Sequence, residues 1–137
     1  MKTYKISPTG ANAFAGTNLD DLQSFSINET AETTTLGSDG LPYMTASLVD
    51  NIIYNVTVTG LDTSIKPNVG SGGSLVLVAS QRDNEGSGVE TGTVTYTFAQ
   101  AVLTDVSTDV NHSGAGSVTF TFSCHSSDGT TSPVAIS

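Results

Sequence analysis

The sequence is poor in cysteine, tryptophan and basic residues. It has one cysteine, no tryptophan and only four lysine or arginine residues in 137. The lone Cys124 excludes an internal disulfide and leaves no partner cysteine for a zinc knuckle or ribbon. The longest apolar run, Leu75 to Ala79, is far shorter than the ~20 residues of a membrane-spanning helix. Because no apolar stretch follows the early lysines, we expect neither a secretory signal nor membrane association.

The shortage of cations limits the partners that the chain can have. Against the 4 basic residues stand 13 acidic ones, which gives a net charge of −9. Four basic side chains are too few to neutralise a row of phosphate groups. We therefore expect no specific binding to nucleic acid. The acidic balance fits a soluble surface, or a surface to which nucleic acid must not adhere.

Charged residues of all kinds are also scarce, at 12%. Disordered chains usually carry much more charge, and long helices need more Ala, Glu, Lys, Leu and Arg than this chain contains. The length is sufficient for one compact domain with a real core. We therefore expect residues 1–137 to form a single domain.

The clearest pattern that is present is the alternation of apolar residues with threonine. Such alternation predicts strands that bury one row of side chains and leave the other row outside. Two segments, Leu75 to Ala79 and Ala101 to Leu103, are apolar on both faces. They are typical of central strands, or of a strand whose outer face meets a partner subunit. The alternating rows are Tyr54, Val56 and Val58; Val94, Tyr96 and Phe98; Val118, Phe120, Phe122 and Cys124; and, more weakly, Phe25 and Ile27.

Glycine-containing turn signals such as Asp39-Gly40 and Asp128-Gly129 separate these segments, because glycine accepts a positive φ. The pattern predicts an all-β fold, either an antiparallel two-sheet β-sandwich or a flattened barrel, of about eight strands. At most one short helix is expected. Its candidate is Ala101 to Ser107, although the β-branched residues there favour a strand.

The segment Thr33 to Ser47 combines turn residues with large apolar ones, and we expect it to be a long loop or an extended hairpin. Its apolar residues need burial, either on the sheet of the same chain or on a neighbouring subunit. We predict that they form a subunit interface. These residues are Leu36, Leu41, Tyr43 and Met44.

The sequence contains no recognisable catalytic motif, neither a nucleophile elbow, nor a phosphate-binding loop, nor a zinc-protease helix. Cys124 and His125 are adjacent in a predicted strand, so they point to opposite faces and cannot hold one metal ion together. We expect no enzymatic activity, no cofactor and no metal.

Four segments of the C-terminal part carry a family resemblance: Gly70 to Val78, Gly92 to Leu103, Gly114 to Phe122 and Ser127 to Pro133. Through them the chain resembles, from roughly residue 45 to residue 137, the tail-tube and related structural proteins of tailed bacteriophages and prophages. The chain is short for a major tube protein, so the main tube, a tube-tip ring or a related virion part are all open.

This resemblance implies a virion tail protein, made in the cytoplasm of a host bacterium. It implies assembly with copies of itself into a ring, usually hexameric, and with other tail proteins around a channel for DNA. Acidic side chains on the channel wall would repel phosphate. The candidates for that wall are Asp20, Asp21, Glu29, Glu32, Asp105 and Asp109.

The main alternative is an immunoglobulin-like or sugar-binding β-sandwich module of a surface protein. Such a module would normally belong to a longer chain with an export signal. The alternation of apolar and threonine residues fits both a tail protein and a surface module. Self-assembly of the purified protein distinguishes the two, because only the tail protein is expected to form rings or tubes.

Overall fold

A computed structural model describes residues 3–6, 12–64, 67–82, 90–114 and 116–137. Within these ranges the protein is entirely β, and Ala101 to Ser107 belongs to a strand. No helix in the described part of the chain could cross a membrane. The nine strands are β1 (Thr3–Ile6), β2 (Ala13–Phe14), β3 (Thr17–Asn18), β4 (Leu22–Gly37), β5 (Met44–Gly60), β6 (Gly72–Arg82), β7 (Glu90–Asp109), β8 (Ser117–Cys124) and β9 (Val134–Ile136).

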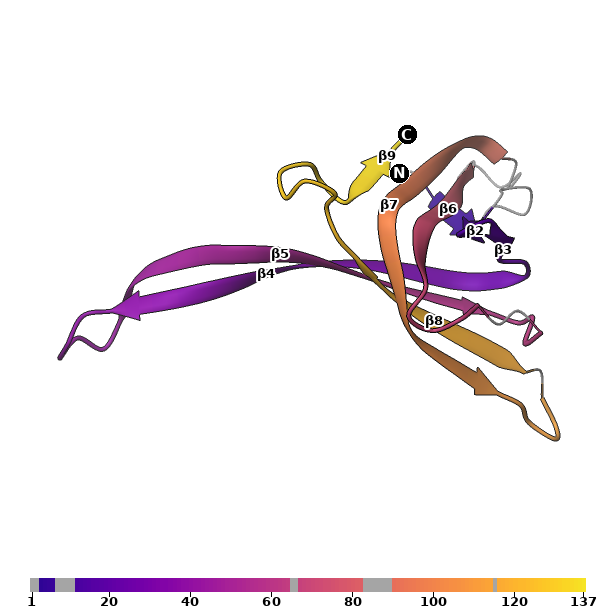
Figure 1. Ribbon diagram of the computed structural model, residues 1–137, viewed down its shortest axis with the longest axis horizontal. Coiled ribbons are helices and arrows are strands. Elements are labelled where there is room, and N and C mark those ends of the chain that lie inside the picture. The colour runs from indigo at the N-terminus through magenta and orange to yellow at the C-terminus, as the bar shows by residue number, and fades with distance from the viewer. Residues whose placement is uncertain (1–2, 7–11, 65–66, 83–89, 115) are drawn as a thin grey trace.

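The strands form one antiparallel sheet, which is open rather than closed into a barrel. Its order is β3-β2-β6-β7-β8-β5-β4, with β1 also paired to β6 and β9 also paired to β7. The long strand β7 connects the two halves of the sheet, because it pairs with β6 up to Val102 and with β8 from Ala101 onward. Figure 1 shows this strand curving between the two groups of strands.

The core lies where the two halves of the bent sheet face each other. The rings of Phe14 on β2 and Phe122 on β8 have their centroids 4.7 Å apart, although β6 and β7 separate these strands in the sheet order. The predicted apolar row of β8 is buried at Val118, Phe120, Phe122 and Cys124, and the row of β5 is buried at Tyr54, Val56 and Val58. A fully buried side chain of this size contributes about 1.5–3 kcal/mol, so these rows hold the bent sheet together.

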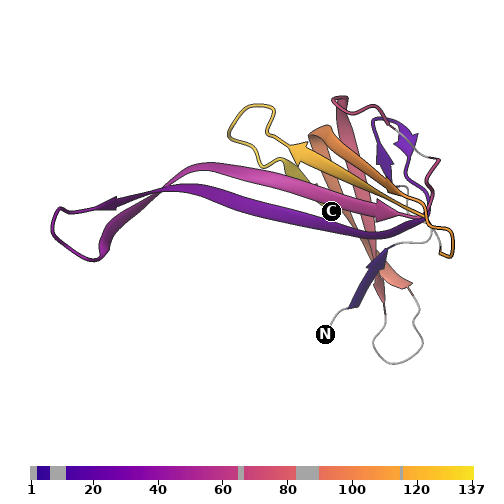
Figure 2. The same ribbon diagram turned by 90° about the horizontal axis from the view of Figure 1, so that it is seen from below.

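The β4–β5 hairpin extends far beyond this core (Figures 1 and 2). Strand β5 pairs with β8 from Tyr54 to Gly60, so among the described strands the preceding part of β5 pairs with β4 alone. Every residue from 28 to 52 is exposed, and we refer to residues 28–52 as the arm. The segment Thr33 to Ser47 is the distal part of the arm, where only residues 38–43 lie outside the strands.

A tight turn closes the arm at its tip. The Leu41 N–H donates to the Ser38 carbonyl oxygen over 3.2 Å, and Gly40 has a φ of 77°. The second predicted glycine turn also has a positive φ, 80° at Gly129. Both conformations strain a residue with a side chain, which explains why glycine occupies these positions.

Candidate assembly interface

The predicted interface residues lie at the exposed end of the arm. Leu36 is 47% exposed, Leu41 61%, Tyr43 83% and Met44 64%. None of them belongs to the core cluster of the chain or packs against it. The alternative in which this segment folds back onto its own sheet is therefore wrong for the isolated chain.

Three further apolar residues on the arm were not predicted from the sequence. Leu48, Val49 and Ile52 are 51%, 62% and 57% exposed. The available signal was the pair of consecutive apolar dipeptides at Leu48-Val49 and Ile52-Ile53. They lack the alternation with polar residues that marks a strand with one buried face.

The register of the hairpin places apolar side chains on both faces of the arm. Leu48 is opposite Thr34, and Val49 is opposite Thr33, so Leu48 and Val49 point to opposite faces. Ile52 is opposite Ala31, on the face that Tyr54 continues into the core. An isolated two-stranded ribbon with apolar side chains on both faces is marginally stable at best in water. Contacts on both faces would therefore stabilise the arm.

The edges of the arm are unpaired as well. Within the described residues, no strand pairs with the outer edge of β4, and none pairs with the outer edge of β5 before Tyr54. An exposed edge presents backbone N–H and C=O groups that can pair with another chain. The arm thus offers apolar faces and hydrogen-bonding edges at the same place.

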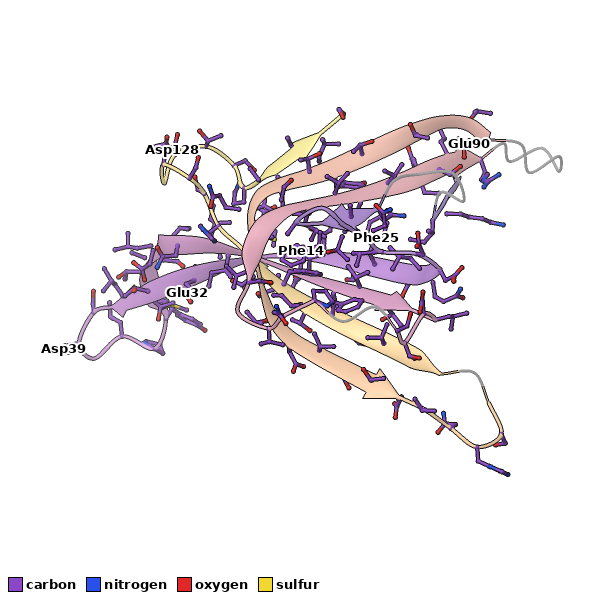
Figure 3. The ribbon with its side chains drawn as sticks, turned by 45° about the vertical axis from the view of Figure 1, so that its right-hand side comes forward. Phe14, Phe25, Glu32, Asp39, Glu90 and Asp128 are labelled. Carbon is purple, nitrogen blue, oxygen red and sulfur yellow. The ribbon has the colours of Figure 1, made fainter. Side chains whose placement is uncertain are left out.

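The charge of the arm is entirely negative. Residues 28–52 include Glu29, Glu32, Asp39 and Asp50 but no lysine, arginine or histidine. Hydrogen bonds between the strands fix two of the carboxylates: Thr34 Oγ1 donates to Asp50 Oδ2, and Asn51 Nδ2 donates to Glu32 Oε2. Figure 3 shows Glu32 on the arm and Asp39 at its tip, away from the core residue Phe14.

The six acidic residues predicted for a channel wall do not gather at one place. Asp20 and Asp21 lie in the turn before β4, Glu29 and Glu32 on the arm, and Asp105 and Asp109 on the C-terminal half of β7. All six are exposed. In the described part of the chain, no group of three or more His, Cys, Asp or Glu side chains is arranged to hold a metal ion.

A broad open crevice lies at the base of the arm, between β5 and the loop 125–133. It has a volume of about 890 Å³ and includes Glu29, Ile52, Tyr54 and His125 in its walls. Asp128 organises the loop: its carboxylate accepts hydrogen bonds from the N–H groups of Thr131 (2.7 Å) and Thr130 (2.9 Å). These bonds, with others from the Thr131 and Ser126 hydroxyls, lower the pKa of Asp128.

Cys124 and His125 both line this crevice, but they differ in burial. Cys124 is the last residue of β8 and is buried, whereas His125 follows the strand and is exposed, so the prediction that both lie in one strand is wrong for His125. Burial raises the pKa of the Cys124 thiol to about 12, so the thiol stays protonated at neutral pH. Cys124 therefore serves as a small apolar residue of the core.

We compared the sequence with protein-family models and with curated proteins, and neither comparison found a match. The most distinctive feature of the chain is the arm, a ribbon that carries apolar side chains away from the core of its own chain.

Proposed function

We propose that this protein is a structural subunit that assembles with copies of itself through the arm. The observation that carries the proposal is the exposure of seven large apolar side chains on one projecting ribbon. Isolated exposed apolar residues are ordinary, whereas a group of them marks an interaction surface. These residues are Leu36, Leu41, Tyr43, Met44, Leu48, Val49 and Ile52.

The physical alternative to assembly is unfavourable. A free arm would leave both faces and both edges of a two-stranded ribbon in water, and its ordering would be opposed by conformational entropy. Packing against another subunit would bury the apolar side chains and satisfy the backbone groups of the edges. Identical subunits provide such a partner at fixed stoichiometry, in a ring or a filament.

Within this proposal, the particle is a ring or tube of a phage tail-like virion. The resemblance of residues 45–137 to tail-tube proteins supports it, together with the net charge of −9. The subunit would be a two-layer sandwich formed by the two halves of the bent sheet, made in the cytoplasm of a host bacterium and assembled, usually as hexamers, with other tail proteins. Carboxylates on the channel wall would repel DNA within a Debye length of about 8 Å.

The channel part of the proposal requires that the assembly bring separate acidic groups together. Asp20 and Asp21, Glu29 and Glu32, and Asp105 and Asp109 occupy three regions of each subunit. Those that face a channel would repel phosphate, and the others would keep the outer surface soluble. Replacing a channel-facing pair by asparagine or glutamine should leave assembly intact and increase retention of DNA by the purified particles.

The test of self-assembly is a concentration series of the purified protein, followed by sedimentation velocity and negative-stain electron microscopy. We expect rings or tubes whose abundance rises with concentration. A species that remains monomeric at all concentrations, in low and high salt, would contradict the proposal and favour the surface-module alternative. The salt series matters because a net charge of −9 on each copy opposes association at low ionic strength.

A further inference from the structure

Besides the arm, the molecule has a second apolar feature without a covering element. It is a groove on the body, where the free edge of β4 faces β1, β7 and β9. Two adjoining cavities, of about 350 and 390 Å³, share Phe25 and Tyr96 in their walls. We define the groove by the side chains of Tyr4, Ile6, Phe25, Tyr96, Val134 and Ile136.

The groove lies where the last strand of the sheet, β4, approaches β1, β7 and β9 without pairing with them. Strand β4 is the last strand of the sheet, while β1 and β9 pair with β6 and β7. The Phe25 and Tyr96 rings form the only aromatic contact across this gap that we observe in the described chain, at a centroid separation of 6.0 Å. Ile136 remains 63% exposed and Tyr4 48% exposed beside them.

We propose, on the basis of the self-assembly described above, that this groove receives the arm tip of a second copy. Apolar complementarity is the first argument. Leu41, Tyr43 and Met44 are the most exposed large apolar side chains at the tip. The groove offers the exposed Tyr4 and Ile136 beside four apolar side chains that are partly buried against the core. A large apolar or aromatic anchor in a concave apolar site is the usual centre of a protein interface.

Charge complementarity is the second argument. Lys5 is exposed and lies in the wall of the cavity next to β1, whereas the arm carries carboxylates and no cation. The other cavity includes the acidic Glu29 in its wall, which would repel the acidic arm tip. We therefore expect Asp39 at the tip to lie on the side of the groove next to Lys5. Opposite charges at the edge of an interface fix its orientation more than they add to its affinity.

The tip cannot occupy the groove of its own chain. Gly37 lies ten residues beyond Ile27 along β4, a distance of about 33 Å at 3.3 Å per residue. Figure 3 shows Asp39 at the end of the arm and Phe25 in the body, so reaching the groove would require the ribbon to unfold. Each copy therefore donates an arm and accepts one. Such a head-to-tail contact generates a ring if the rotation closes and a filament if it does not.

A photocrosslinker at position 43 identifies the acceptor surface directly. Benzoylphenylalanine would replace Tyr43 in the full chain, and labelled and unlabelled copies would be mixed so that mass spectrometry distinguishes crosslinks between copies from crosslinks within one. We expect crosslinks between copies to residues 4–6, 23–27, 94–98 or 134–137. Particles whose crosslinks lie only at other surfaces would contradict the proposal that the groove receives the arm tip, while self-assembly itself would still be supported. The absence of both particles and crosslinks between copies would overturn both proposals.

Point variants provide an independent readout. Ile136→Glu places an acid in the groove opposite an acidic arm, and we expect it to weaken self-association at least about tenfold. Val110→Glu is the matched control, because Val110 is 76% exposed, follows the end of β7 and lies outside both the groove and the arm. It gives the same net charge and should weaken association much less. If the two variants weaken self-association equally, the proposal that the groove is the acceptor surface is wrong.

A charge exchange tests the orientation of the tip. Lys5→Glu alone should weaken association by about two- to fivefold, the size of an exposed ion pair. Asp39→Lys in the same chain should restore it. If the double variant associates no better than Lys5→Glu, the pairing of the tip with the β1 side of the groove is wrong.

Discussion

Replacing Tyr43 and Met44 by alanine should separate folding from assembly. The two side chains are 83% and 64% exposed and do not pack against the core cluster of the chain. Surface substitutions of this kind usually change the free energy of unfolding by no more than about 0.5 kcal/mol. We therefore expect the double variant to fold, with an unfolding midpoint in urea close to that of the wild type under conditions where both are monomeric.

The effect on assembly should be much larger. A large apolar side chain contributes about 1.5–3 kcal/mol when it is fully buried. Tyr43 and Met44 are already partly covered, so we multiply this value by the exposed fraction of each side chain. Burial of both side chains by a partner then contributes about 2–4 kcal/mol to the free energy of association. At 1.4 kcal/mol for each factor of ten, its loss raises the Kd of self-association between about 30-fold and about 1,000-fold.

Sedimentation velocity over a concentration series measures this Kd. Val110→Ala serves as the control, since it shortens an equally exposed apolar side chain away from the arm. Assembly of the double variant at wild-type concentrations would refute the reasoning, as would an equal loss in the control. Unfolding of the double variant would show that these side chains support the fold, which also contradicts the account.

Two predictions concern the fold. Phe122→Ala removes a fully buried ring that contacts Phe14. We expect it to lower the free energy of unfolding in urea by about 3–5 kcal/mol. A decrease below about 1 kcal/mol would contradict the position of Phe122 in the core. Asp128→Asn tests the loop 125–133. Because the pKa of Asp128 is lowered in the folded state, its stabilising contribution is present above the unfolded pKa of about 4 and is lost as the pH falls below it. The difference in melting temperature between wild type and variant should therefore be larger at pH 7 than at pH 2, and equal differences would contradict this role.

The sequence predicted the core strands well because a core imposes a pattern. In β8, the alternation from Val118 to Cys124 reflects one face against the core and one face outside, and the structure buries the predicted row. The same logic explains Leu75 to Ala79, which lies in the central strand β6 between β7 on one side and β1 and β2 on the other. The single bent sheet was harder to predict, because local patterns do not reveal that β7 changes partners near Ala101.

The arm was predicted only in part, for a related physical reason. Between residues 28 and 52 no core lies against either face, so there is no alternation to read. The turn residues around Asp39-Gly40 indicate the tip, and the sequence predicts interface residues at Leu36, Leu41, Tyr43 and Met44. It does not predict the exposed Leu48, Val49 and Ile52. The groove was not predicted at all, because it combines residues from β1, β4, β7 and β9 that only the tertiary fold brings together.

Electron microscopy of the concentrated wild-type protein, at a resolution that traces the strands, tests the central claim most directly. We expect closed rings or tubes in which the arm of each subunit lies against its neighbour and Tyr43 is buried. Particles whose arms project freely into solvent, or a field of single subunits at every concentration, would contradict the account.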